Sequence, residues 1–227
     1  MLALALFCVA CGTHAPSQKL TVAAAADLNF AMPEIVRQFR AARPEVELQI
    51  AYGSSGNFFA QIGNRAPFDM FLSADVEYPR QLASAGVGAG NSVFTYAVGR
   101  LVVWVPAGSP LDPATALRQT SVKHVAIANP QHAPYGRAAQ AALRSLGLYQ
   151  AVEPKLVLGE NIAQTLQFVE SGAADAGIVA LSLALAPPLR ARGRYWEIPP
   201  DAYPRIEQGG IVLKDSKAAR DFRAFLL

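Results

Sequence analysis

The sequence predicts an α/β protein with two lobes, each built on a mostly parallel sheet flanked by helices. Strand-like and helix-like segments alternate in two separate series, and a β-α-β order favours parallel strands with helices on both faces of the sheet. A long extended run, residues 95–105, separates the two series, and a second run, residues 206–213, follows them. We therefore expect two extended crossings between a lobe of residues 20–96 plus 206–227 and a lobe of residues 97–205.

The first series follows a short polar tether. Residues 20–26 form an apolar run typical of a buried strand, and the helix expected at residues 29–42 carries Ile35, Val36 and Phe39 at the spacing of a core-facing stripe. The other expected elements of this series are a strand at 46–52, a helix up to residue 64, a strand at 68–73 and a helix near 76–85.

The second series repeats the alternation. Its expected elements are a strand at 124–128, a helix at 135–146, a strand at 155–158, a helix at 162–171 and a strand at 175–180. The extended run at 206–213 then leads into a C-terminal helix. In open α/β sheets, ligands bind beyond the carboxyl ends of the strands, at the loops that lead into helices. Those loops are therefore the candidate site.

The composition indicates a globular protein without a nucleic-acid partner. Of 227 residues, 52% are hydrophobic and 16% are charged, and 20 basic residues against 17 acidic ones give a formal charge of +3. The length suits one large domain or two small ones, each able to bury a core. Arg190, Arg192 and Arg194 alternate near a glycine, and the other basic residues are scattered, which indicates solvated faces rather than a nucleic-acid patch.

The N-terminus predicts export. Residues 1–10 form an apolar block too short to span a membrane and similar to the hydrophobic region of a secretory signal. The segment Val9-Ala10-Cys11-Gly12 resembles a lipoprotein cleavage box that would leave Cys11 lipidated, so residues 1–19 are expected to be a leader and tether. Cleavage nearer Ala15, or a buried N-terminal element, are the alternatives. No cysteine follows Cys11, so no disulfide is expected in the mature protein.

Four strand-to-helix loops, two from each lobe, are candidates for binding a small anion. They are Ala26-Asp27, Ser54-Ser55, Pro134-Tyr135 and Glu160-Asn161-Ile162. The N–H groups of a helix's first turn have no partner within the helix, and the helix dipole favours negative charge there. These loops could therefore hold an oxyanion between the lobes without any Lys or Arg.

The segment Gly53-Ser54-Ser55-Gly56 combines short hydroxyl donors with glycines that allow close backbone approach. A flexible loop or a helix cap explains the same four residues. A nucleophilic serine is disfavoured because the Gly-x-Ser-x-Gly elbow is absent. His132 has no second His or Cys at metal-ligand spacing and is expected to be a surface loop residue. No catalytic residue is predicted.

The segment Ala133-Pro134-Tyr135-Gly136 predicts a helix that Pro134 initiates and Tyr135 heads. The Tyr135 N–H, and its phenol, could reach a ligand at the helix start. The alternative interpretation is that proline only initiates the helix and that Tyr135 packs into the core.

Together these segments resemble the periplasmic molybdate-binding proteins, the receptors of molybdate importers. The resemblance runs along nearly the whole mature chain, through Val22-Ala23-Ala24-Ala25-Ala26-Asp27-Leu28, Gly53-Ser54-Ser55-Gly56, Phe71-Leu72-Ser73-Ala74-Asp75, Phe94-Thr95-Tyr96-Ala97-Val98-Gly99, Ile127-Ala128-Asn129-Pro130, Ala133-Pro134-Tyr135-Gly136 and Ser171-Gly172-Ala173-Ala174-Asp175. Several motifs in this order are far more specific than any one of them.

The resemblance implies a type II periplasmic-binding-protein fold that holds a dehydrated tetrahedral dianion, molybdate or tungstate, with neutral donors. Carried over by position, the ligand-binding residues would be Ala26, Asp27, Ser55, Tyr135 and Ile162, the last through its backbone N–H. The resemblance also implies a monomeric, extracytoplasmic, non-enzymatic protein that has no cofactor and no metal beyond the oxyanion. Its partner would be the membrane permease of an ABC importer.

Three positions depart from the family pattern. Ala26 and Asp27 stand where relatives offer a hydroxyl or amide side chain, and Ala180 stands where some relatives have Tyr. We expect Asp27 to turn away from the anion and cap the helix that follows. The alternative is a protonated carboxyl that donates a hydrogen bond to the anion. A binding protein of the same fold for a ferric complex or an organic anion is the alternative, with Asp27, Tyr135 and Tyr203 as oxygen ligands. An enzyme is disfavoured because no acid–base pair or activated nucleophile is evident.

Overall fold

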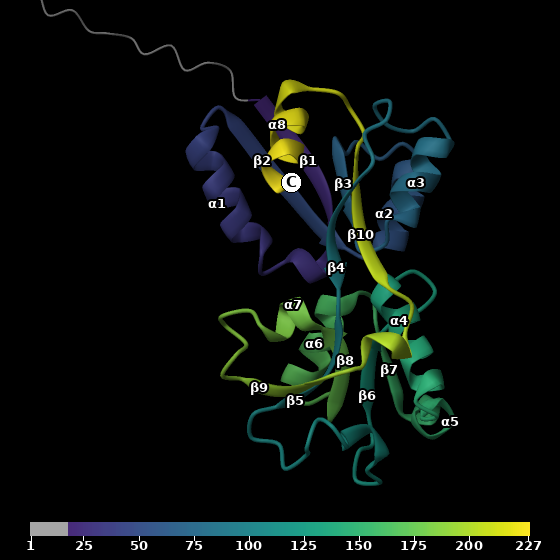
Figure 1. Cartoon of the computed structure of the whole chain (residues 1–227). Helices are drawn as coiled ribbons and strands as arrows, with labels where there is room; N and C mark the ends of the chain where they lie inside the picture. Colours follow the sequence, from purple (N-terminus) through teal and green to yellow (C-terminus); the bar gives the residue numbers. More distant parts are fainter. Residues whose placement is uncertain (1–17) are drawn as a thin grey trace, which may run out of the picture.

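The computed structural model describes residues 18–227 (Figure 1). The lipidation box at Cys11 and nearly all of the expected leader lie outside the described residues. Two five-stranded sheets lie one above the other in Figure 1, and helices flank both sheets. The α/β fold class predicted from the sequence is confirmed.

The first sheet has the strand order β2-β1-β3-β10-β4. Its strands and helices are β1 (Gln18–Ala25), α1 (Met32–Ala42), β2 (Val46–Gly53), α2 (Ser55–Gly63), β3 (Met70–Ser73), α3 (Glu77–Ser84), β4 (Phe94–Gly99), β10 (Ile206–Val212) and α8 (Lys217–Leu226). A 3-10 helix, Ala26–Leu28, directly follows β1. Strand β1 is parallel to β2 and β3, whereas β10 is antiparallel to β3 and β4.

The second sheet has the order β7-β6-β8-β5-β9 and repeats this plan. Its elements are β5 (Leu101–Pro106), β6 (Val125–Ala128), α4 (Pro134–Ser145), α5 (Tyr149–Val152), β7 (Leu156–Gly159), α6 (Ile162–Glu170), β8 (Ala176–Ala180), α7 (Leu181–Ala184) and β9 (Gly193–Glu197). Strand β6 is parallel to β7 and β8, and β5 is antiparallel to β8 and β9. Each sheet is therefore mixed, with parallel pairs on one side and antiparallel pairs where a crossing strand enters.

The long extended run of the sequence is divided between the two sheets. Strand β4 ends at Gly99 in the first sheet and β5 begins at Leu101 in the second, so the chain crosses at Arg100. The return crossing leads into β10, which pairs with both β3 and β4. Strand β9 and the short helices α5 and α7 were not predicted. Each is only four or five residues long, too short for a clear hydrophobic period.

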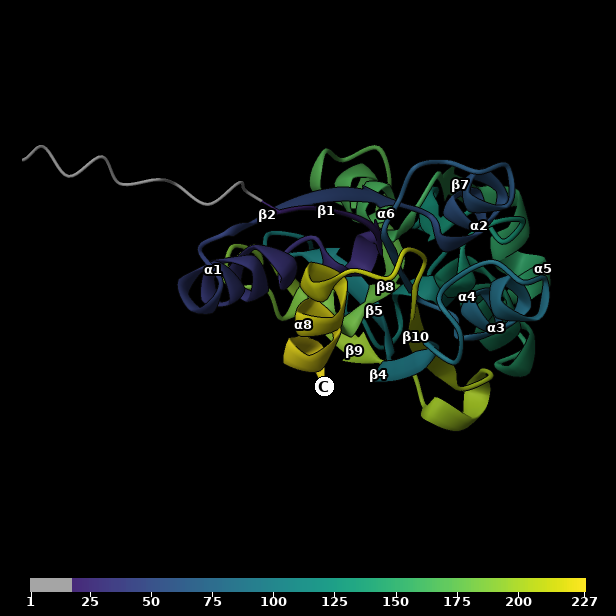
Figure 2. The same cartoon turned by 90° about the horizontal axis from the view of Figure 1, so that it is seen from above.

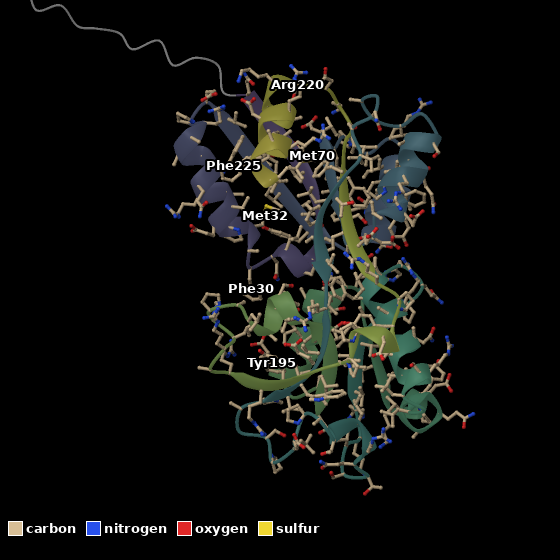
Figure 3. All side chains as sticks on the ribbon, viewed as in Figure 1. Phe30, Met32, Met70, Tyr195, Arg220 and Phe225 are labelled. Carbon is tan, nitrogen blue, oxygen red and sulfur yellow. The ribbon has the colours of Figure 1, made fainter. Side chains whose placement is uncertain are left out.

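Both faces of the first sheet are covered by helices. Side chains alternate along β1, so Val22 and Ala24 pack toward α1 and α8, and Ala23 packs toward α2 and α3. Figure 2 shows these two helix pairs on opposite sides of the sheet. Phe225 of α8 is labelled in Figure 3. Its ring meets that of Phe39 of α1 edge to face, at 5.4 Å between ring centroids. This packing fixes the sheet and the loops at its carboxyl edge.

No helix within residues 18–227 combines the length and the apolar character that a membrane crossing requires.

Candidate functional site

A small cavity lies between the two sheets, at the carboxyl ends of their parallel strands. Figure 1 shows how the two sheets are placed one above the other. It is lined by Ala25, Ala26, Asp27, Gly53, Ser54, Ser55, Ala74, Ala133, Pro134, Tyr135, Asn161 and Ile162. The structure thus brings all five candidate residues from the sequence into one cavity. No Lys, Arg or His belongs to this lining, so any anion held there would meet neutral donors.

Three helices begin at the cavity, and local sequence explains each start. Ser54 caps α2 by accepting the Asn57 N–H at 3.3 Å. Asn161 caps α6 by accepting two N–H groups of the first turn, both at 3.0 Å. Pro134 starts α4, where its fixed φ suits the first helical position. These capping side chains accept N–H groups from the second and third helical positions. The N–H groups of Ser55 and Ile162, at the first helical positions, therefore have no acceptor in their own helices.

The Ser55 hydroxyl is oriented by a contact that the sequence did not indicate. Its Oγ accepts the N–H of Ala74, just beyond β3, at 2.9 Å, and the residue is buried. An oxygen that accepts this bond keeps its own hydrogen to donate. The Ser55 hydroxyl can therefore donate into the cavity together with the backbone N–H of the same residue.

The Asp27 side chain does not cap a helix, so that expectation was wrong. The 3-10 helix begins directly after β1, and α1 begins only at Met32, which places Asp27 inside the short helix and not ahead of a long one. Instead, Asp27 Oδ2 accepts the Tyr135 phenol at 3.2 Å and the Gln208 amide at 2.5 Å. The Gln208 amide also donates to the Tyr135 oxygen at 2.8 Å.

Burial controls the ionisation of this cluster. Burial raises the pKa of Asp27 to about 6, an effect that the hydrogen bonds from Gln208 and Tyr135 reduce. Burial also raises the pKa of the Tyr135 phenol well above its ordinary value, and the nearby Asp27 carboxyl adds to that rise. The Asp27 Oδ1 atom is buried and has no hydrogen-bond partner among the described residues.

Gln208 was not predicted from the sequence to belong to the site. It lies on β10, within the extended run, and is almost fully buried. A buried amide needs a hydrogen-bond partner. In β10 the side chains alternate between the two faces of the sheet, so Gln208 shares the face of Ile206, whereas Glu207 lies on the other face. A polar residue on the apolar face of a crossing strand was the signal that could have identified it.

Contacts between the two sheets close the cavity at its edge. The Gly56 N–H donates to the His132 carbonyl oxygen at 2.9 Å, and Ser54 Oγ lies 3.1 Å from His132 Nδ1. Arg137 of α4 pairs with the Asp75 carboxylate at 2.6 Å and donates to the Tyr78 hydroxyl at 2.9 Å. His132 was expected to be a surface loop residue, but its side chain is 19% exposed and takes part in this closure.

Two residues named from the sequence lie outside the lining. Tyr203 accepts the Leu101 N–H at 3.1 Å, so the oxygen ligands suggested for a ferric complex are not brought together. Ala180 ends the buried strand β8 and does not border the cavity. Within residues 18–227, no group of three His, Cys, Asp or Glu side chains is arranged to hold a metal ion.

Comparisons with known proteins agree with this geometry. The family model for bacterial extracellular solute-binding proteins matches residues 20–227. A molybdate-binding protein of Azotobacter vinelandii is 40% identical over 216 residues, which cover 93% of this chain and 84% of that protein. A molybdate-binding protein of Rhodobacter capsulatus is 41% identical over 179 residues, covering 78% of this chain and 70% of that protein.

A comparison with solved structures leads to the same group of proteins. The solved structure of the periplasmic molybdate-binding protein of Azotobacter vinelandii superimposes with a TM-score of 0.84 at 33% sequence identity. The superposition covers 91% of this chain and 92% of that structure.

Proposed function

Because the chain belongs to the bacterial extracellular solute-binding proteins, and among them to the molybdate-binding proteins, we propose that it captures molybdate or tungstate between its two sheets. The ligand then passes to the membrane permease of an ABC importer. The observation that carries this proposal is the convergence of three helix starts, from both sheets, on one cavity lined without Lys or Arg.

The proposed ligand contacts are the Ser55 hydroxyl and the backbone N–H groups of Ser55, Tyr135 and Ile162. The loop at Ala26 and Asp27 closes the remaining side. Helix N-termini stabilise a dianion through fixed N–H dipoles that need no counter-charge. Ser55 and Ile162 approach from different sheets, so a bound anion would hold the two sheets together.

Selectivity follows from the radius that these donors define. Rigid N–H groups set for a large tetrahedral oxyanion make longer, weaker bonds to smaller sulfate. A charge-assisted hydrogen bond contributes about 1.5–3 kcal/mol, so several poorly placed bonds discriminate strongly. Molybdate and tungstate share size and charge, and we expect the cavity to accept both.

The cellular setting is inferred in the same way. We propose an exported, extracytoplasmic protein that acts as a monomer, binds without catalysis and needs no cofactor. Lipidation at Cys11 and the division of the chain into two lobes stay predictions. The first crossing between the sheets lies at Arg100, a few residues after the boundary expected at residue 96. Binding should draw the lobes together, because each supplies part of the donor set.

Calorimetric titration of the purified protein with molybdate tests the proposal. One anion should bind per chain, and small-angle scattering should show compaction on binding. Ferric citrate is the matched alternative ligand, with an absorbance change as the sign of phenolate coordination. The absence of molybdate and tungstate binding, or saturable binding of ferric citrate alone, would refute the proposed function.

A further inference from the structure

Asp27 presents an unusual chemical group to a cavity built for a dianion. The residue is only 2% exposed, and it borders the same cavity as Ser55 and Ile162. An ionised carboxylate at this position would repel the dianion, and no cation in the cavity lining offsets that repulsion. Binding of a dianion therefore depends on the protonation state of Asp27.

The two carboxyl oxygens have different surroundings. Oδ2 accepts two hydrogen bonds, from the Tyr135 phenol and the Gln208 amide. Oδ1 is buried and has no partner among residues 18–227. A buried polar atom without a partner is costly unless something absent from the structure satisfies it. A proton on Oδ1, donated to a ligand oxygen, would satisfy both this atom and the anion.

We propose that Asp27 binds the oxyanion as a neutral carboxylic acid, with its proton on Oδ1 donated to one ligand oxygen. This inference rests on the proposed function and adds a specificity-determining residue to it. The proton comes from solvent, so each dianion captured at a pH where the empty site is ionised carries one proton into the closed protein. Release of the anion returns that proton.

The groups that face Asp27 support a neutral acid. The titratable neighbours are two phenols, Tyr135 on α4 and Tyr96 on β4, and burial raises the pKa of both well above the ordinary value. From β10 the Gln208 amide faces it, and from α7 the Ser182 hydroxyl donates to its backbone carbonyl at 3.1 Å. Strand β2 and α6 border the cavity through Gly53 and Ile162, which do not titrate.

The ionisation of the empty site agrees with this geometry. Burial raises the pKa of Asp27 to about 6 before any anion is present. A dianion in the cavity would raise that pKa further, because a nearby negative charge favours the protonated form. Binding near neutral pH is therefore coupled to proton uptake.

The neutral acid also decides which anions the site accepts. A protonated carboxyl donates a hydrogen bond and so suits a fully ionised oxyanion. An ionised carboxylate would instead accept a hydrogen bond and favour a protonated anion such as hydrogen phosphate. The protonation state of Asp27 thus sets selectivity by hydrogen-bond direction, independently of anion size.

Calorimetry of molybdate binding in two buffers of different ionisation enthalpy measures this proton directly. Between pH 6 and 8.5 molybdate is fully ionised in solution, so any proton taken up is bound by the protein. We expect uptake to approach one proton per anion at pH 8, with Kd rising about tenfold per pH unit well above the pKa of the free site. Asp27→Asn should bind molybdate without proton uptake, with a Kd independent of pH and lower than wild type at pH 8.

Two control variants make the assignment specific. Asp201→Asn removes an exposed carboxylate and should keep full proton uptake. His132→Gln removes the imidazole that contacts Ser54 at the cavity edge, and proton uptake that persists in this variant belongs to Asp27. The measurement on the unchanged protein does not depend on how any variant folds.

Several results would overturn the inference. Tight molybdate binding by the unchanged protein without proton uptake would show that the acid is not neutral in the complex. Uptake lost in His132→Gln would assign the proton to the imidazole. Loss of binding in Asp27→Asn at every pH, or a preference of the unchanged protein for phosphate, would indicate an ionised carboxylate. If neither molybdate nor tungstate binds the unchanged protein at any pH, the proposed function itself fails.

Discussion

The backbone N–H of Gly56 donates to the carbonyl oxygen of His132 at 2.9 Å, and a Cβ atom on Gly56 would lie 2.5 Å from that same oxygen. Gly56 belongs to α2 beside the first sheet, and His132 precedes α4 beside the second. The lack of a side chain at this position is therefore what lets the helix starts of the two sheets approach each other over the cavity.

Gly56→Ala should hinder closure without disturbing either lobe. We expect molybdate binding to weaken by about 1–3 kcal/mol, the usual cost of overpacking a tight contact. The melting temperature without ligand should change little, because alanine suits a helix at least as well as glycine. Calorimetry and small-angle scattering measure the two effects.

Gly63→Ala is the matched control for this variant. It lies at the other end of the same helix, where an added Cβ would meet no atom within 4 Å. Its affinity and its ligand-induced compaction should both equal those of the unchanged protein. Equal compaction in Gly56→Ala would contradict the closure role assigned to this glycine.

Ser55→Ala tests the side-chain donor. Removal of the hydroxyl should weaken molybdate binding by about 1.5–3 kcal/mol, the range for a hydrogen bond to a charged group. Ile162→Ala should have a much smaller effect, because its proposed contribution is a backbone N–H. Calorimetric Kd values compare the two variants, and a larger loss in Ile162→Ala would show that the α6 loop binds in another way.

Asp27 should also make stability depend on pH in the absence of ligand. Burial raises the pKa of this carboxyl from 3.8 to about 6. The folded state then binds the Asp27 proton more strongly than the unfolded state does. Protonation of Asp27 therefore stabilises the folded state fully below pH 4, and this stabilisation is lost as pH rises through 6. The shift corresponds to about 3 kcal/mol.

Other carboxylates have the opposite pH trend, so the informative quantity is the difference between variants. The free energy of unfolding of Asp27→Asn, relative to the unchanged protein, should increase by about that amount between pH 4 and 7. The exposed control Asp201→Asn should show a flat difference. Urea unfolding at several pH values measures both, and a flat profile for Asp27→Asn would mean that the folded carboxyl is not destabilised by burial.

The ion pair between Arg137 and Asp75 should slow ligand release. Its atoms are 2.6 Å apart and join the two sheets, with the arginine side chain 40% exposed. Pairs this exposed contribute roughly 0.2–1 kcal/mol. Arg137→Gln should therefore speed molybdate dissociation by a few-fold in stopped-flow measurements, whereas Arg144→Gln on the same helix should not. An unchanged dissociation rate would leave the pair without a role in closure.

The sequence predicted the sheets and their cavity well because long alternating segments carry a strong periodic signal. The strand at 20–26 and the helix at 29–42 appear as β1 and α1. On α1, Phe39 is buried, and Ile35 and Val36 are partly buried against the same core. The loops at Ser55, Tyr135 and Ile162 could be predicted to meet, since parallel strands bring their carboxyl ends to one edge.

The contacts that depend on tertiary geometry could not be predicted in this way. Asp27 seemed to precede a helix, but its side chain bonds to Gln208, 181 residues away. No local pattern encodes a contact at that distance. The closure contact at His132 likewise depends on how two loops from different sheets meet. Sequence periodicity describes elements, whereas these pairs depend on how the elements pack.

Selectivity between molybdate and sulfate depends on whether the cavity is shaped for a large tetrahedral oxyanion. Calorimetric Kd values for molybdate, tungstate and sulfate should be measured side by side at pH 7 on the unchanged protein. We predict one tight site for molybdate and tungstate, with sulfate weaker by at least about a hundredfold, since two or more imperfect hydrogen bonds each lose about 1.4 kcal/mol or more. Sulfate binding as tight as molybdate binding would show that the cavity is not shaped for the larger oxyanion.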